Sequence, residues 1–307
     1  MNPGADFNAL VERAMATGGR DRMRPVIEKE LLHYDILFAL DQAGLLDHLT
    51  FQGGTALRLC HGAPRFSENL DFVAGRDFQH EDLDPIKACI EKQIGKRYGL
   101  DVSVRGPGQS EEHHRGKEVQ VNRWQISVVT APARPDLPRQ RIRIEVVNVP
   151  AWTREPRALI HNYDFLPDGY ADTLIMTETL EEIMADKLVS LINTQRYIRY
   201  RDIWDLRWLA QQGAQPNGEL VGRKINDYGV TSYLHKLEAF RPRLAEIIVD
   251  KAFLDSMTRF LPAEVLARTF ERREFATFLH RETDKLLAET ARQLAGTSPE
   301  NGFPGLF

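Results

Sequence analysis

The sequence has 307 residues, of which 42% are hydrophobic and 27% charged, and its formal net charge is −4. This length allows two compact domains, each with its own core. No run of about 18 apolar residues occurs, which excludes a membrane-spanning helix. The weak negative charge argues against a surface coated for nucleic acid. Two scattered cysteines and an N-terminal segment without a continuous apolar core predict a cytoplasmic protein.

The first half of the chain predicts helices and short strands in alternation. Apolar residues recur at helical spacing in some segments and alternate with polar residues in others. The expected helices are residues 25–47, residues 55–61 and the segment between Pro85 and Gly99. The expected strands are residues 49–52, 70–74, 100–105, 119–130 and 140–149. In the last strand, Glu145 shares one face with Arg141 and Arg143, and Ile144 lies on the other face.

From about residue 170 the pattern becomes helical and stays so. One helix is expected from about residue 178 to 194, with Thr177 as a capping residue and acidic residues in its first turn. Basic segments such as residues 196–207 are typical of solvated helix faces, and contact with RNA phosphate is the less favoured alternative. We therefore expect an α+β protein, with an α/β domain at residues 1–168 and a helical domain at residues 169–307.

The segment "FQGGTALRLCHGAPRFSENLDF", residues 51–72, carries the first chemical signal. Gly53 and Gly54 precede a helix, where two glycines let backbone amides approach a phosphate, and the Thr55 hydroxyl adds a donor. Asn69 and Asp71 alternate along a strand and so face the same side. Nucleotide-transferring enzymes often follow such a glycine turn with two acids at this spacing, which hold Mg²⁺ on the triphosphate. The alternative is a structural hairpin whose polar residues face solvent.

The second signal consists of two charges on apolar helix faces. Lys187 lies within the apolar stripe of helix 178–194, and Asp202 lies on the apolar face of the next helix. A charge on such a face is costly unless it is paired or borders a cavity. Two interpretations stay open: a structural salt bridge between Lys187 and Asp202, or a cleft where Lys187 meets a triphosphate.

These segments together resemble a known family. In order, "FQGGTALRLCHGAPRFSENLDF", "LEEIMADKLVSL" and "RYIRYRDIWDL" resemble the AbiEii/AbiGii-type nucleotidyltransferase toxins of bacterial toxin–antitoxin and abortive-infection systems. The likeness also includes "IEKELLHYDILFAL", and the ordered combination is more specific than any single motif. The resemblance implies a nucleotidyltransferase-like (DNA polymerase β-like) α/β domain, a helical domain, and an active cleft between them.

The resemblance also implies an activity and a site. Members of the family resemble enzymes that transfer a nucleotide from an NTP, with Mg²⁺, to an RNA acceptor, which in several members is the 3′ end of tRNA. Translation is then arrested, and a separately encoded antitoxin protein restrains the toxin. The positions assigned to the phosphate turn and its contacts are Gly53, Gly54, Thr55 and Arg65. Those assigned to the metal and triphosphate cluster are Ser67, Asn69 and Asp71.

Three further residues complete the expected site. The resemblance assigns Lys187 to phosphate binding and Asp202 to the catalytic cleft. A third acid would complete a metal site and could deprotonate the acceptor hydroxyl. Glu145 is the best candidate, because it lies on the polar face of a strand in the α/β half. The alternative for Glu145 is ion pairing with Arg141 or Arg143 on a solvated face.

Asn69 departs from the family pattern, because an amide oxygen can ligate a cation but brings no negative charge. Two explanations stay open: a natural variant with weak or no transfer activity, or an inactivating Asp-to-Asn change that lets a toxic enzyme be produced. The intact residues around position 69 favour the second. The leading hypothesis is an RNA-modifying toxin. Its rivals are a non-catalytic nucleotide-binding interaction protein and a nucleotidyltransferase acting on small molecules such as aminoglycosides.

Overall fold

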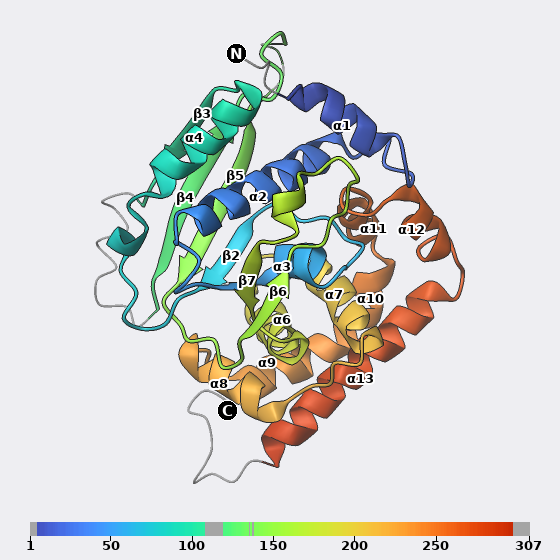
Figure 1. The fold of residues 1–307 in the computed structure, drawn as a ribbon. Coiled ribbons are helices and arrows are strands. Elements are labelled where there is room, and N and C mark those ends of the chain that lie inside the picture. The colour runs from blue at the N-terminus through green and yellow to red at the C-terminus, as the bar shows by residue number, and fades with distance from the viewer. Residues whose placement is uncertain (1–4, 108–118, 135, 137, 297–307) are drawn as a thin grey trace. The chain divides into compact units, whose positions relative to one another are not determined.

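A computed structural model of the chain describes residues 5–107, 119–134, 136 and 138–296 (Figure 1). These residues form a seven-stranded sheet and many helices, which confirms the predicted α+β class. The chain divides into two compact units, Met1–Thr177 and Glu178–Phe307. The division follows the last strand of the sheet, whereas the boundary expected from the sequence is at residue 168. No helix of the described residues is long and apolar enough to cross a membrane.

The first unit contains the sheet, whose strand order is β3-β4-β5-β2-β1-β7-β6. The strands are β1 (Thr50–Gln52), β2 (Leu70–Val73), β3 (Val102–Arg105), β4 (Val121–Val128), β5 (Gln140–Val147), β6 (Glu155–Ala158) and β7 (Leu174–Thr177). All five expected strands are present. The sequence pattern did not predict β6 or β7. Strand β6 is largely exposed, contains Pro156 and lacks apolar alternation. The neighbours β2 and β5 are parallel, although many residues separate them in the chain.

Helices cover one face of this sheet. They are α1 (Phe7–Met15), α2 (Arg24–Gln42), α3 (Gly53–Cys60) and α4 (Ile86–Tyr98), with short 3-10 turns η1 (His80–Leu83) and η2 (Asp168–Tyr170). Helix α2 packs on β5, and α4 packs on α2 and β3 (Figure 1). Ile142, Ile144 and Val146 of β5 are fully buried, whereas Arg143 and Glu145 alternate with them and keep solvent contact. The polar face of β5 therefore lies opposite the helices, as its alternation predicted.

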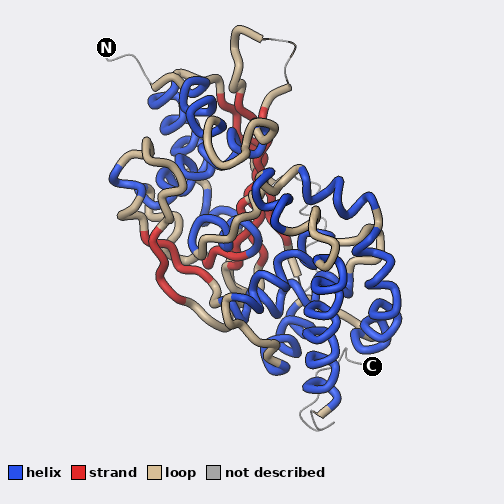
Figure 2. The backbone as a smooth tube through the Cα atoms, turned by 90° about the vertical axis from the view of Figure 1, so that its right-hand side faces the viewer, coloured by secondary structure: helices blue, strands red, loops and turns tan. Residues whose placement is uncertain are grey.

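The second unit is helical in its described residues (Figure 2). Its helices are α6 (Leu180–Asn193), α7 (Tyr200–Gln211), α8 (Gly218–Asp227), α9 (Tyr233–Phe240), α10 (Leu244–Val249), α11 (Lys251–Thr258), α12 (Ala263–Arg268) and α13 (Phe275–Ala295), with η3 (Arg241–Arg243). Helix α6 packs against α7, α8 and α9. Its N-cap is Thr179, which accepts from the Glu182 amide. Thr177, the expected cap, instead pairs with Phe51 in the sheet and is therefore extended.

A fully buried lysine joins α8 to the start of α6. Lys224 Nζ lies 2.8 Å from Glu178, 2.7 Å from Glu182 and 2.9 Å from Asp186. Three carboxylates around one ammonium group leave excess negative charge at a buried site. Burial, and then the charge of Asp186, raises the pKa of Glu178 well above its usual value, so this carboxyl keeps a proton where it would ordinarily lose it.

Replacing Lys224 with methionine should lower the free energy of unfolding by about 3–5 kcal/mol, because the buried carboxylates lose their counter-ion. Glu178→Gln should cost less than about 1.5 kcal/mol, because an amide resembles the protonated carboxyl. Urea unfolding at neutral pH measures both variants. Equal losses for the two substitutions would contradict this arrangement.

The Glu178→Gln variant should also change how stability depends on pH. Above pH 4.5, the ordinary value for glutamate, the unfolded chain releases the Glu178 proton while the folded chain retains it. This group therefore makes stability fall as the pH rises from 4.5 toward its raised folded pKa. Glu178→Gln should show a shallower fall in that window than the wild type.

Candidate functional site

Two glycines form the centre of the candidate site, at the first turn of α3. Gly53 has φ +75°, and a Cβ at this residue would lie 3.0 Å from Asp71 Oδ2. A Cβ at Gly54 would lie 2.3 Å from Arg65 Nη2 and 3.1 Å from Ser67 Oγ. The glycines thus allow three polar side chains to lie directly against the beginning of a helix. At this end backbone amides lack intrahelical partners, which suits an anion.

Helix α3 and the segment 65–69 are held together by a buried cation. Arg58 of α3 forms a two-pronged pair with Glu30 of α2, at 2.8 and 3.0 Å. The same guanidinium lies over the Phe66 ring, 4.2 Å from its centroid. Phe66 stands between Arg65 and Ser67, so the Arg58–Glu30 pair fixes the backbone that presents both side chains to Gly54.

Helix α2 holds the same segment at its other end. Lys29 Nζ lies 2.7 Å from Glu68 Oε1, and His33 Nε2 lies 3.2 Å from the Glu68 carbonyl oxygen. The Thr55 hydroxyl is buried and donates to the Asn69 carbonyl oxygen. The hydroxyl proton of Thr55 is therefore engaged within the protein, where it ties α3 to the segment before β2.

The polar groups expected to hold a metal lie on adjacent strands. Asp71 and Glu145 are register partners in the parallel pair β2–β5, so both carboxylates belong to the same face of the sheet. Asn69 directly precedes β2, and its Oδ1 lies 3.4 Å from the Arg143 amide. Oxygen donors of this kind suit Mg²⁺. Among the described residues, no three His, Cys, Asp or Glu side chains gather as a metal site. An aspartate at position 69 would add the acid that the family pattern has and this chain lacks.

Glu145 also has cationic partners. Its Oε1 lies 3.1 Å from Arg123 Nε and 3.7 Å from Arg143 Nη1. Of the two arginines considered from the sequence, Arg143 makes this contact, and Arg123 of β4 was not anticipated. Arg123 is the register partner of Glu145 in the antiparallel β4–β5 pair, a relation that strand alternation alone does not reveal.

In the helical unit, Lys187 forms the ion pair of the salt-bridge interpretation and one more. Lys187 Nζ lies 3.2 Å from Asp202 Oδ1 and 2.7 Å from Asp205 Oδ2, and all three side chains are buried. Asp202 also accepts from Ser190 and contacts Arg199. Burial disfavours the charged form of Asp202, but the charges of Lys187 and Arg199 outweigh it and hold its pKa below the usual value.

Asp205 was not recognised as a site residue. It follows Asp202 by one helical turn in "RDIWDL", a spacing that places both carboxylates on one helix face and could have identified it. The salt-bridge interpretation of Lys187 and Asp202 describes the observed contacts. The convergence of this pair with the glycine turn in one cleft stays a prediction.

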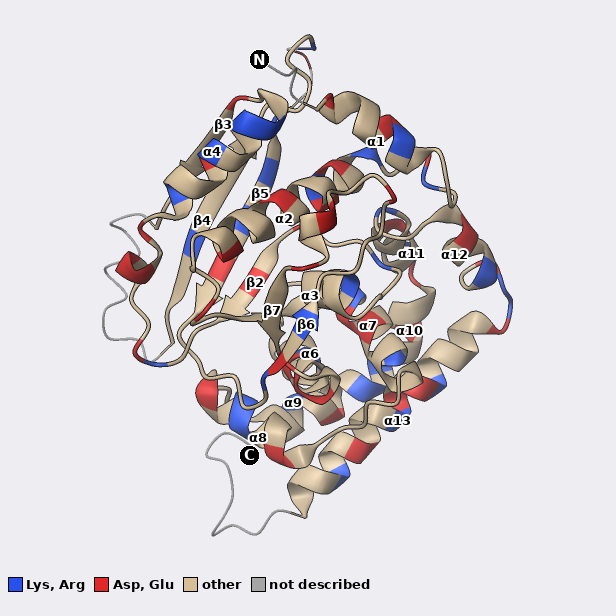
Figure 3. Cartoon of the chain, viewed as in Figure 1, with Lys and Arg blue, Asp and Glu red and all other residues tan. Residues whose placement is uncertain are grey.

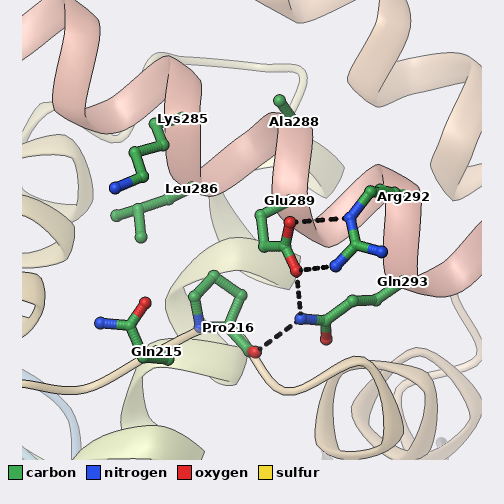
Figure 4. Close-up of a pocket in the computed structure, with 8 residues that line it drawn as sticks. All are labelled: Gln215, Pro216, Lys285, Leu286, Ala288, Glu289, Arg292 and Gln293. Atoms are coloured by element: carbon green, nitrogen blue, oxygen red, sulfur yellow. Dashed lines mark hydrogen bonds and ion pairs between the residues drawn. The ribbon is translucent and has the colours of Figure 1, made fainter.

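A different surface hollow belongs to the helical unit, where α13 meets the segment before α8 (Figure 4). Gln293 donates to the Pro216 carbonyl oxygen and to Glu289, and its Oε1 accepts from the Gly218 amide at 2.6 Å. Glu289 also pairs with Arg292. These groups satisfy one another, so we interpret this hollow as a structural junction that anchors the N-terminus of α8.

A family model for the nucleotidyl transferase AbiEii toxin, of type IV toxin–antitoxin systems, matches residues 35–281. The chain belongs to this family. It is a nucleotidyltransferase toxin of a toxin–antitoxin system, as the ordered motifs predicted. Among curated proteins, none matches the sequence significantly.

The chain is similar to solved structures. MenT4, a nucleotidyltransferase toxin from Mycobacterium tuberculosis, is similar with a TM-score of 0.56 and 18% identity, over 97% of this chain and 92% of MenT4. JHP933 from Helicobacter pylori has a TM-score of 0.47 and 19% identity, over 87% of this chain and 94% of its own. At 18% identity, the likeness of this chain to MenT4 supports only the architecture described above.

Alanine at Gly54 should weaken nucleoside triphosphate binding, because its Cβ would displace the Arg65 guanidinium. The affinity should fall about tenfold or more, because one hydrogen bond to a charged group contributes ~1.5 kcal/mol to binding. Gly95→Ala is the matched control, since Gly95 is also helical and a Cβ there meets nothing within 4 Å. That variant should gain about 0.5–1 kcal/mol of stability with unchanged affinity. Calorimetric titration with each NTP tests both, and equal affinities would contradict the assignment.

Lys187→Gln should lower the free energy of unfolding by about 3–5 kcal/mol, because two buried carboxylates lose their partner. Arg199 also contacts Asp202, but the Arg199 side chain is 35% exposed. Arg199→Gln should therefore lower the free energy of unfolding by no more than about 1 kcal/mol. Urea unfolding compares the two. The phosphate-binding assignment has a separate readout: NTP should raise the melting temperature of Lys187→Gln less than that of the wild type, and an equal rise would contradict it.

Proposed function

We propose that the chain transfers a nucleotide from an NTP to an RNA acceptor, the 3′ end of tRNA, and thereby blocks translation. We also propose that a separately encoded antitoxin protein restrains it. The observation that carries this proposal is the arrangement of Arg65, Ser67 and Asp71 against Gly53 and Gly54 at the start of α3. Membership in a nucleotidyltransferase toxin family supports the reaction class.

The triphosphate binds at the glycine turn in this proposal. The first amides of α3 lack intrahelical partners and attract negative charge. Arg65 is 3% exposed, so water screens its charge weakly. Its guanidinium and the Ser67 hydroxyl lie against Gly54 and donate hydrogen bonds to phosphate oxygens. A side chain at position 54 would displace the Arg65 guanidinium, since its Cβ would lie 2.3 Å from Arg65 Nη2.

Oxygen atoms of Asp71, Glu145 and Asn69 would hold Mg²⁺, since Asp71 and Glu145 share one face of the sheet, Asn69 directly precedes β2, and all three are hard ligands that this cation prefers. Bound Mg²⁺ supplies positive charge that neutralises the leaving pyrophosphate. Glu145 also accepts the proton of the attacking RNA hydroxyl. The hydroxyl oxygen bonds to the α-phosphorus as the bond to pyrophosphate breaks.

A second function, nucleotide binding without transfer, is favoured by one observation. Position 69 holds an amide, so the site has one negative charge fewer than the family pattern. Glu145 also lies within 3.1 Å of Arg123, which neutralises part of its charge. A site of this kind keeps its phosphate donors while losing the electrostatic stabilisation of transfer.

Asn69→Asp should separate the two functions. A carboxylate at position 69 faces the same side as Asp71, which strengthens Mg²⁺ binding and raises nucleotide transfer by about 10²–10³, the usual effect of one such electrostatic contact. Titration with Mg²⁺ alone measures the first effect. Labelled NTPs with total RNA on a denaturing gel measure the second. Expression without an antitoxin should inhibit growth.

Asp71→Ala in the Asn69→Asp background should abolish transfer, tighter Mg²⁺ binding and growth inhibition together. A chain carrying Asn69→Asp that transfers no nucleotide to any RNA, and inhibits no growth, would reject the transferase proposal. NTP binding that persists in that chain would establish the binding function in its place.

A further inference from the structure

The helical unit has a second hollow, of about 750 Å³, that is not part of the site above. Its walls are the end of α6, the segment 194–200, and α9 with η3. Thirteen residues border it, and none of them is Asp or Glu. The hollow therefore differs in charge from the chain as a whole, whose formal net charge is −4.

Three cations border this hollow: Arg196, Lys236 and Arg243. Within the part of the chain that the structure describes, none of the three pairs with a carboxylate; Lys236 instead donates to Asn193 Oδ1 at 2.9 Å. Elsewhere in the described residues many charged side chains form ion pairs, and Figure 3 shows red and blue positions intermixed along the helices. Cations without acidic partners, gathered around one concavity, attract phosphate groups.

Aromatic rings border the same hollow. Tyr197 is 61% exposed, and Tyr200 and Phe240 also line the wall. An exposed ring beside unpaired cations is the combination that binds single-stranded nucleic acid, because bases stack on the rings while cations follow the backbone. A hollow of this size accommodates unpaired nucleotides, not the width of a duplex. The sequence alone favoured solvated helix faces for residues 196–207, and the structure places Arg196 in this different setting.

The wall of the hollow continues into the Lys187 cluster. Ile198 and Tyr200 line the hollow, and Arg199 between them contacts Asp202. Asp202 in turn pairs with Lys187. An occupant of the hollow would thus lie against the segment that leads to two residues expected in the catalytic cleft.

We propose that this hollow binds the unpaired end of the RNA acceptor, an inference that rests on the proposed function. Tyr197 stacks on a base, and Arg196, Lys236 and Arg243 neutralise the phosphates of the strand. The site thereby selects single-stranded ends of RNA without reading base edges, because stacking and phosphate contacts tolerate any sequence.

Fluorescence anisotropy of the full chain with a short labelled single-stranded RNA tests the proposal, with duplex RNA as the comparison. Tyr197→Ala should weaken single-strand binding at least about fivefold, which corresponds to ~1 kcal/mol of base stacking. Tyr197→Phe, which keeps the ring, should bind like the wild type. Because Tyr197 is exposed, neither substitution should change the melting temperature.

The salt dependence of binding tests the phosphate contacts. Arg196→Gln should reduce the slope of log affinity against log salt concentration by about 0.7, the value for one phosphate of a single strand. Arg281→Gln is the matched control, because Arg281 is 69% exposed, belongs to the same unit and does not border the hollow. Equal slopes for both variants would overturn the proposal, as would equal binding of duplex RNA or no RNA binding at low salt.

Failure of this inference and failure of the proposed function give different results. If Asn69→Asp transfers nucleotides and Tyr197→Ala leaves its KM for RNA unchanged, the hollow is not the acceptor site but the function stands. If Asn69→Asp transfers nothing while Tyr197→Ala still weakens RNA binding, the function fails and the binding surface stands. Binding of an acidic protein at these residues, without RNA binding, would reassign the surface to a protein partner.

Discussion

The candidate site depends on the close approach of side chains to two glycines. A Cβ would lie 3.0 Å from Asp71 Oδ2 at position 53 and 2.3 Å from Arg65 Nη2 at position 54, so neither side chain could keep its place beside a larger residue. The segment that carries Arg65 is held by a neighbouring buried side chain. Arg58 is paired with Glu30 and packs on the ring of Phe66, which follows Arg65 in the chain. The donors are therefore positioned before any ligand arrives, which lowers the entropic cost of binding.

The helical unit uses buried charge differently. Lys187 and Lys224 are both buried. Lys187 of α6 contacts two carboxylates of α7, and Lys224 of α8 contacts carboxylates at the start of α6. Such pairs gain little net stability over apolar packing, but a misplaced helix would leave a charge unpaired at high cost. These clusters accordingly specify how α6 meets α7 and α8. In the Lys187 cluster, the same requirement holds two potential site residues in a fixed geometry.

Cations of the described residues differ in their surroundings. Arg58 and Lys224 are neutralised by acids and stabilise the fold. Arg65 is buried beside the glycine turn, where its charge acts at short range. Arg196 and its neighbours around the hollow have no acidic partner in the described residues, so their field extends into solvent. The setting of each cation, and not the net charge of the chain, indicates whether it stabilises the fold or attracts a ligand.

Local pattern determined much of the architecture. Alternation over residues 140–149 predicted which face of β5 carries Arg143 and Glu145, and the burial pattern of that strand confirms it. These features depend on the two-residue period of a strand, which any sequence displays directly. The order of the family motifs likewise predicted the nucleotidyltransferase toxin family that the family match confirms.

The tertiary structure decided which distant residues meet. Glu145 lies beside Asp71 because β5 pairs in parallel with β2, and Arg123 reaches Glu145 because β4 pairs on its other side. Lys187 gains Asp205 as a second partner through the packing of α7 on α6, and the hollow around Tyr197 forms where α9 packs against α6. Strand order and helix packing arise from burial of apolar surface across the whole chain, so no local period encodes them.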